Sequence, residues 1–146
     1  TWLGTSGPAV FGVQGQPHPD NSPGLRFESM VGKDLEGNFL LFGGFTGGGA
    51  DDTVWRLDIS TLQWTWIRGS KTLGANPAYG TMGVEHHSNT PGARIRSVAW
   101  SDNAGNFWVT GGSALGSSSS QPADLWRLNF NPPSRIKWED ILPYEK

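Results

Sequence analysis

The chain has no cysteine in its 146 residues, and only 16% of those residues are charged. The absence of cysteine excludes disulfides, thiolate metal sites and a cysteine nucleophile. The net charge of −2 comes from dispersed residues, without the basic stripe that nucleic acid binding requires. No apolar run approaches the roughly 20 residues that span a bilayer. We therefore expect no nucleic acid partner and no membrane insertion.

Glycine, proline and tryptophan are abundant instead, with 21, 10 and 8 residues. This composition is typical of short strands that are joined by turns and held by aromatic packing. Apolar and polar residues alternate in Val54–Asp58 and in Ser97–Trp100, which is a β-like pattern, and no segment has helical periodicity. The sequence therefore predicts an all-β fold.

An internal repeat organises the chain. Several matching residues stand 68 positions apart, namely Gly12 and Gly80, Arg26 and Arg94, and Gly44 and Gly112. The spacing grows to 71 between Trp55 and Trp126, so the second copy has extra loop residues. We divide residues 1–146 into the end of a preceding unit (1–3), a first repeat (4–67) and a second repeat (68–142).

Each repeat predicts four short strands that are separated by turn residues such as Glu36-Gly37-Asn38. The predicted strands of the first repeat are Arg26–Val31, Phe39–Phe42, Thr53–Asp58 and Trp64–Ile67. Those of the second repeat are Arg94–Trp100, Phe107–Thr110, Asp124–Asn129 and Ile136–Asp140.

The glycine doublets Gly43-Gly44 and Gly111-Gly112 each end an apolar strand, and a tryptophan follows at a loop's distance. This arrangement resembles the kelch repeat, one four-stranded blade of a β-propeller. The kelch period is about 50 residues, and the longer spacing here resembles the long variant of the galactose-oxidase central-domain type. The resemblance implies two four-stranded blades, which form a partial propeller or one protomer of a ring.

The resemblance also implies structural roles. The four doublet glycines allow positive φ and close backbone approach. Tryptophans, each able to bury roughly 150–250 Å², would pack between sheets at Trp55, Trp64, Trp126 and Trp138. The arginine that matches Arg26 and Arg94 bonds backbone carbonyls between blades, with a ligand-facing role as the alternative. We expect replacement of Trp55 or Trp126 to unfold the blade, and replacement of Asp51 or His86 to leave it folded.

Antiparallel strand order places the long loops 44–52, 69–92 and 112–123 on one face. Long loops on a rigid scaffold are where recognition is usually located. This long-loop face predicts six candidate binding residues: Asp51, Asp52, Tyr79, His86, His87 and Asn89.

Metal and catalytic sites have less support. His18 and His86 are equivalent, and with His87, Asp20 and Glu85 they offer metal-ligand chemistry. Because equivalent residues belong to separate blades, we predict no metal and no cofactor. The chain has no Gly-x-Ser-x-Gly elbow, no Lys-Ser/Thr ending to its glycine-rich loop 43–49, and no cysteine for a copper-radical oxidase. We therefore predict no catalytic residue.

The leading hypothesis is a non-enzymatic kelch-repeat interaction module that binds a protein partner through its long-loop face. One alternative is a carbohydrate-binding propeller that uses Tyr79, Trp108 and Asn89, and another is a scaffold part of a larger enzyme. Propellers have about 4–8 blades, so the partners include further blades of one propeller or identical chains in a ring. Low charge, hydroxyl-rich loops and missing cysteine favour a secreted or cell-surface protein.

Overall fold

The structure, a computed structural model, describes residues 7–113, 122–130 and 137–141, the last of these as backbone only. No helix occurs in these ranges, and their strands form antiparallel sheets, which confirms the all-β prediction. The strands are β1 (Met30–Lys33), β2 (Phe39–Phe42), β3 (Phe45–Thr46), β4 (Gly49–Ala50), β5 (Val54–Asp58), β6 (Gln63–Arg68), β7 (Val98–Ser101), β8 (Phe107–Thr110), β9 (Leu125–Asn129) and β10 (Lys137–Ile141).

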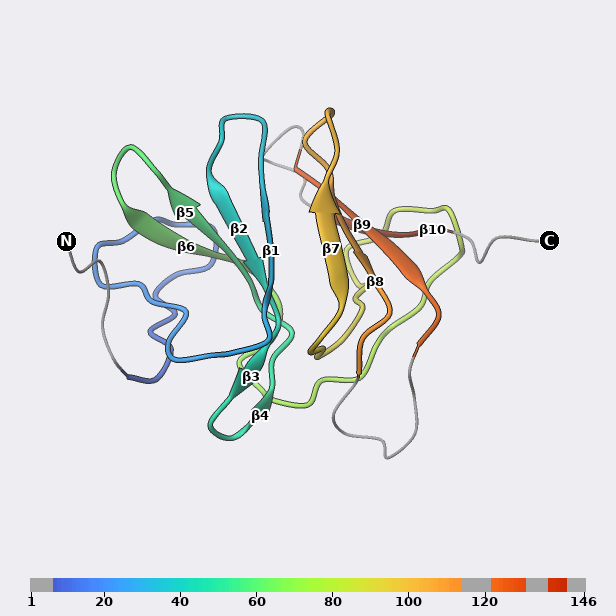
Figure 1. Cartoon of the computed structure of the whole chain (residues 1–146), viewed down its shortest axis with the longest axis horizontal. Helices are drawn as coiled ribbons and strands as arrows, with labels where there is room; N and C mark the ends of the chain where they lie inside the picture. The colour runs from blue at the N-terminus through green and yellow to red at the C-terminus, as the bar shows by residue number, and fades with distance from the viewer. Residues whose placement is uncertain (1–6, 114–121, 131–136, 142–146) are drawn as a thin grey trace.

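Two four-stranded sheets have the same strand order (Figure 1). Sheet one has the order β1-β2-β5-β6, and sheet two has the corresponding order β7-β8-β9-β10. A separate two-stranded hairpin, β3–β4, lies in the connection between β2 and β5. The second strand of each sheet has the predicted bounds, since an apolar run that ends at a glycine doublet marks it clearly. Both doublets have positive φ, from 62° at Gly43 to 97° at Gly44.

The first strands begin later than predicted. The sequence places their starts at Arg26 and Arg94, whereas β1 begins at Met30 and β7 begins at Val98. Glu28 and Arg96 have φ of 58° and 59°, and this left-handed conformation interrupts the extended chain. The β3–β4 hairpin was also not predicted, because its strands have only two residues each.

Alternation along the strands gives each sheet two different faces. Face A carries Val31, Phe39, Leu41, Trp55 and Leu57 in sheet one, and Ala99, Phe107, Val109, Trp126 and Leu128 in sheet two. Face B carries Met30, Gly32, Leu40, Phe42 and Val54 in sheet one, and Val98, Trp100, Trp108, Thr110 and Leu125 in sheet two. Members of each list stand at equivalent positions of the two repeats.

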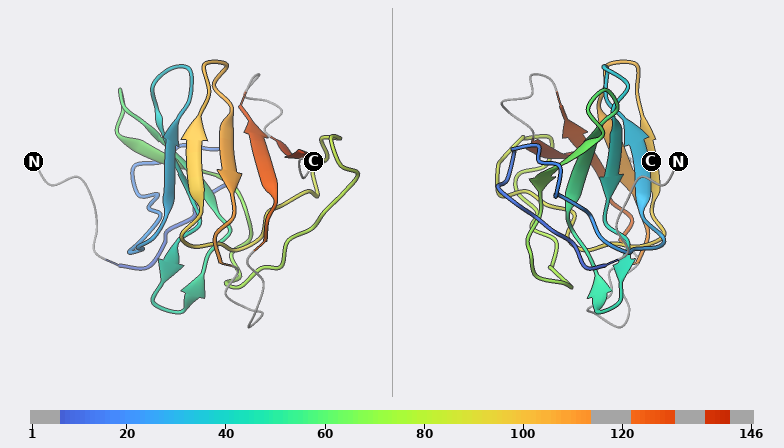
Figure 2. Two further views of the ribbon diagram at one scale, coloured as in Figure 1. Left: turned by 45° about the vertical axis from the view of Figure 1, so that its right-hand side comes forward. Right: turned by 90° about the vertical axis from the view of Figure 1, so that its left-hand side faces the viewer.

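The core lies between face B of sheet one and face A of sheet two. Met30, Leu40 and Phe42 from the first sheet form one buried cluster with Phe107 and Trp126 from the second. The first strands β1 and β7 lie side by side in the middle of the molecule (Figures 1 and 2). The two sheets therefore stack in the same sense, so that face A of sheet one and face B of sheet two point away from the core.

The long segment before the first strand of each repeat is called its leading loop. The first leading loop runs along the outer strand of sheet one, where Gly15 N donates to Trp66 O at 2.8 Å and His18 N donates to Trp64 O at 3.4 Å. These bonds satisfy backbone groups of β6 that no other strand pairs with. Part of the first leading loop thus lies along the edge of sheet one.

Candidate functional site

A buried arginine organises the second repeat. Arg94 donates through Nη1 to Asp124 Oδ1 at 2.5 Å and through Nη2 to Asp124 Oδ2 at 2.6 Å. Its guanidinium also donates to Pro91 O at 2.8 Å and to Gly111 O at 3.1 Å. The carbonyls that it binds belong to its own repeat. The backbone carbonyl oxygen of Arg94 accepts a hydrogen bond at 2.8 Å from Gly44 N, which belongs to the first repeat.

Asp124 receives two further hydrogen bonds, from Trp126 Nε1 at 2.8 Å and from the Tyr79 hydroxyl at 2.7 Å. Burial by itself raises the pKa of Asp124, but the hydrogen bonds from Arg94, Trp126 and Tyr79 outweigh burial and lower that pKa. Burial and the bond to Asp124 raise the pKa of Tyr79. Tyr79 therefore ties the second leading loop to the ion pair.

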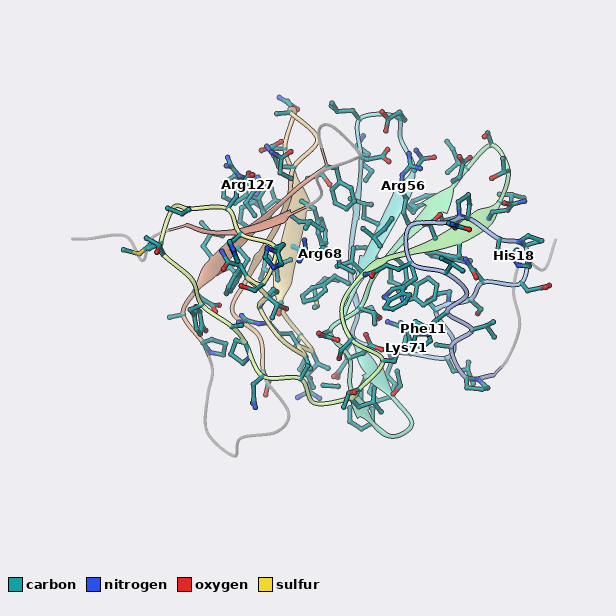
Figure 3. All side chains as sticks on the ribbon, turned by 180° about the vertical axis from the view of Figure 1, so that it is seen from behind. Phe11, His18, Arg56, Arg68, Lys71 and Arg127 are labelled. Carbon is teal, nitrogen blue, oxygen red and sulfur yellow. The ribbon has the colours of Figure 1, made fainter. Side chains whose placement is uncertain are left out.

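The first repeat builds the same cluster from different residues. Phe11 stands at the position of Tyr79, and its ring centroid lies 5.3 Å from that of Trp55, compared with 5.4 Å between Tyr79 and Trp126. Thr53 stands at the position of Asp124 and accepts from Trp55 Nε1 at 2.9 Å. Lys71 Nζ lies 5.3 Å from the Phe11 ring centroid (Figure 3).

Asp51 supplies the carboxylate that the first repeat would otherwise lack. Its Oδ2 lies 3.6 Å from Arg26 Nη2, and both side chains are 5% exposed. Its Oδ1 accepts hydrogen bonds from Thr53 N and Thr53 Oγ1. The expectation that Asp51 can be replaced without loss of folding is therefore wrong, because Asp51 belongs to a buried ion pair. In the sequence Asp51 is only a polar residue in a loop, and nothing there indicates that it is buried.

Asp52 and Asn89 are buried as well. Asp52 Oδ1 accepts from Ser70 N at 2.9 Å, and burial raises the pKa of Asp52 although the Ser70 bonds oppose the change. Asn89 Nδ2 donates to Val84 O at 3.0 Å and braces the second leading loop. Three of the six candidate binding residues, Asp51, Asp52 and Asn89, are thus buried and held by internal bonds.

The other three candidates are exposed. The rings of His86 and His87 lie 4.2 Å apart, and Arg68 Nη2 donates to the His87 carbonyl. An open groove of about 530 Å³ beside them has Asp52, His87 and Asn89 in its lining. Tyr79 does not line this groove. The structure therefore brings three of the six candidates together around one groove.

The histidines of the two repeats do not meet. His18 lies at the outer edge of sheet one, far from Arg68, which holds the His87 segment (Figure 3). Within the described residues, no group of three or more histidine, aspartate or glutamate side chains has the geometry of a metal site.

The sequence did not indicate a row of side chains on face B of sheet two. The indoles of Trp100 and Trp108 stack in parallel planes, with centroids 5.9 Å apart and an interplanar angle of 1°. Arg127 Cζ lies 5.7 Å from the centroid of Trp108, and Trp108 Nε1 donates to Asp102 Oδ2 at 2.8 Å. Trp108 is half-buried on an outward face. Successive side chains of a strand point to opposite faces, so the inward position of Phe107 predicts an outward position for Trp108.

Other residues of the second leading loop were also missed. Met82 and Val84 are exposed between Tyr79 and His86. Single apolar residues in a loop give no sequence signal, because their exposure depends on what packs against the loop. Of the tryptophans assigned to packing, Trp55 and Trp126 are buried, Trp64 is half-buried, and the Trp138 side chain lies outside the described residues.

Comparison with known proteins identifies no family for the chain: no protein-family profile matches it, and neither does any curated protein. In the part of the chain that the structure describes, there is no helix with the length and apolar character needed to cross a membrane.

Proposed function

We propose that the chain is a non-enzymatic kelch-type β-propeller segment that binds a protein partner through its second leading loop. Support for the kelch assignment comes from two sheets of identical strand order, from the positive φ of both glycine doublets, and from the buried Trp55 and Trp126. Each feature recurs at equivalent positions of both repeats, as expected for successive blades.

The observation that carries the binding proposal is the exposure of Tyr79, Met82 and Val84 on one anchored loop, next to the paired rings of His86 and His87. Aromatic residues and methionine are enriched in protein interfaces, and charged residues are depleted at their centres. The loop extends beside β10 at one end of the molecule (Figures 1 and 2).

The loop is held before any partner binds. The Tyr79 hydroxyl is bonded to Asp124, Asn89 Nδ2 is bonded to Val84 O, and Arg68 is bonded to the His87 carbonyl. A partner then orders little additional chain, which lowers the entropic cost of association. The neighbouring polar groove offers hydrogen-bonding groups at the rim of such an interface.

A second candidate function is carbohydrate binding, and the exposed Trp100 favours it. Trp100 is 42% exposed and stacks on Trp108, with Asp102 and Arg127 as polar neighbours. Aromatic faces that lie next to polar groups are suited to the apolar side of a sugar ring. In that case Trp100 rather than Asn89 would be the essential residue, because Asn89 is buried.

The two candidates separate in a binding experiment on the full chain. Peptides are selected from a random display library against the immobilised protein and then measured with the double variant M82D/V84D. We expect at least a tenfold loss of affinity, and no loss with V13D, a matched change in the first leading loop where Val13 is also exposed. Equal affinity for the wild type, M82D/V84D and V13D would show that the second leading loop is not the binding site.

A glycan array tests the alternative. Binding that the W100A substitution abolishes, together with the absence of any loop-dependent peptide, would replace protein binding by carbohydrate binding.

A further inference from the structure

A cleft of about 440 Å³ lies against face B of sheet one, where strands β5 and β6 form its outer half. Its floor is apolar, because Ile67 on β6 and Phe130 after β9 both pack against the core between the two sheets. The first leading loop forms a further wall. Small-ligand sites have volumes of about 300–1,000 Å³, so this β5–β6 cleft can hold a small organic molecule or one long side chain.

Three carboxylates and one guanidinium line the β5–β6 cleft (Figure 3). Arg56 donates through Nε to Asp34 Oδ2 at 2.6 Å, and its Nη2 lies 3.4 Å from Glu36 Oε2. Asp58 takes part in no salt bridge among the described residues. Hydrogen bonds, first of all from Ser60, lower the pKa of Asp58 and keep it ionised at neutral pH. Three negative charges against one positive charge make the cleft attractive to a cation.

Thr65 supplies a second and independent indication of a ligand. Leu40 pairs with Arg56 and Arg56 pairs with Thr65, so Thr65 lies on face B and lines the cleft. Thr65 is only 7% exposed, and none of the described residues gives its hydroxyl a hydrogen-bond partner. A buried hydroxyl that lacks a partner is unfavourable. A ligand that bonds to this hydroxyl therefore gains affinity.

We propose that the β5–β6 cleft binds a primary ammonium group on a short aliphatic chain. The aliphatic chain lies on Ile67 and Phe130, and the ammonium donates hydrogen bonds to the Asp58 carboxylate and the Thr65 hydroxyl. Asp58 and Thr65 are diagonal neighbours in the β5–β6 ladder. Diagonal partners stand about 7–8 Å apart, which leaves space for one ammonium between their side chains.

A cation is favoured over a neutral polyol because a polyol would leave the excess negative charge uncompensated. Arg56 does not repel the cation, since Asp34 neutralises it at 2.6 Å. A free alkyl amine and the lysine side chain of a partner protein share this chemistry. The site does not involve the second leading loop, so it stands or fails independently of the proposed function.

The test is a titration of the isotope-labelled full chain with n-butylammonium at pH 7, followed by the nuclear magnetic resonance shifts of backbone amides. We expect the amides of Asp58 and Thr65 to shift. We expect n-butanol, the neutral molecule of the same length, to bind about fivefold more weakly. Nα-acetyl-lysine amide separates the two sources: binding at least as tight as that of butylammonium indicates a lysine side chain, and weaker binding indicates a free amine.

D58N and T65V should each weaken butylammonium binding about tenfold, because each removes one hydrogen bond to a charged group. D20N is the matched control: it removes the same charge from an exposed side chain outside the cleft and should leave the affinity unchanged. If T65V loses its folded circular dichroism spectrum, E36Q takes its place, with a smaller loss expected.

Three results would overturn the proposal: no shift of the cleft amides with any probe, equal affinity for butylammonium and butanol, or equal losses in D58N and D20N. The last of these would show attraction by the overall negative charge rather than by a site.

Discussion

The Tyr79 hydroxyl donates a hydrogen bond to Asp124 Oδ2 across 2.7 Å, at a position where the first repeat has a phenylalanine. Both aromatic rings lie tilted on a buried tryptophan at nearly the same distance. Only Tyr79 adds a polar link to an ion pair, and its loop carries the exposed residues of the proposed binding site. The difference between the repeats therefore concerns how firmly a loop is anchored.

The Y79F substitution removes this link and leaves the ring in place. Hydrogen bonds to charged groups contribute about 1.5–3 kcal/mol, and Tyr79 is half exposed, so we expect a loss of about 1–2 kcal/mol in the free energy of unfolding. Urea denaturation followed by tryptophan fluorescence measures it. The matched change F11Y should have little effect, since Thr53 stands where Asp124 would be; equal losses in both would contradict the anchoring role.

The D51A substitution leaves Arg26 buried without its carboxylate. Breaking a buried ion pair on one side costs about 3–5 kcal/mol, and we expect a loss near the lower value because Thr53 Oγ1 still accepts from Arg26 Nη1. H86A should change the stability by less than about 0.5 kcal/mol, as exposed substitutions usually do. Thermal unfolding by circular dichroism compares the two, and equal melting temperatures would be the contrary result.

Replacement of Trp126 by alanine should destabilise the second repeat strongly. Trp126 is fully buried in the cluster between the sheets. Substitutions of this kind cost about 3–5 kcal/mol, a large share of the stability of one domain. Near-ultraviolet circular dichroism should show loss of fixed aromatic packing. V13A, which alters an exposed side chain in the first leading loop, is the control and should keep that signal.

Acid should weaken the fold through Asp34 and Asp124. Burial alone would raise both pKa values, but hydrogen bonds outweigh it and lower them, mainly from Arg56 to Asp34 and from Arg94 to Asp124. A lowered folded-state pKa adds stability that is complete above the unfolded value of about 3.9 and is lost as the pH falls through the folded value.

We therefore expect the urea midpoint to drop steeply below about pH 4. D124N should be less stable than wild type at pH 7 and should lose less on acidification. D20N changes an exposed carboxylate and should follow the wild-type curve. Asp52 acts in the opposite sense: its pKa is raised by burial, so its contribution to stability is lost as the pH rises through its folded value. If the urea midpoint of D124N falls on acidification as much as that of the wild type, Asp124 is not among the responsible groups.

Much of the sheet architecture follows from local patterns. The bounds of β2 and β8 were predicted because an apolar run and a glycine doublet are both local signals. The starts of β1 and β7 were wrong, because a left-handed residue at Glu28 or Arg96 has no signal in a side chain of that type. The candidate site was predicted less well, since three of its six residues, Asp51, Asp52 and Asn89, are buried.

The sequence by itself determined the all-β class, the repeat and the equivalence of positions between its two copies. Only the tertiary structure decided which equivalent residues are covered. Phe39 and Phe107 stand at equivalent positions and both follow Gly-Asn in the sequence, yet one is exposed and the other is buried. Likewise, Asp51 is a polar loop residue in the sequence and half of a buried ion pair in the fold. The physical reason is that turn and strand preferences act over a few residues, whereas burial depends on the sheet that packs from outside the local segment.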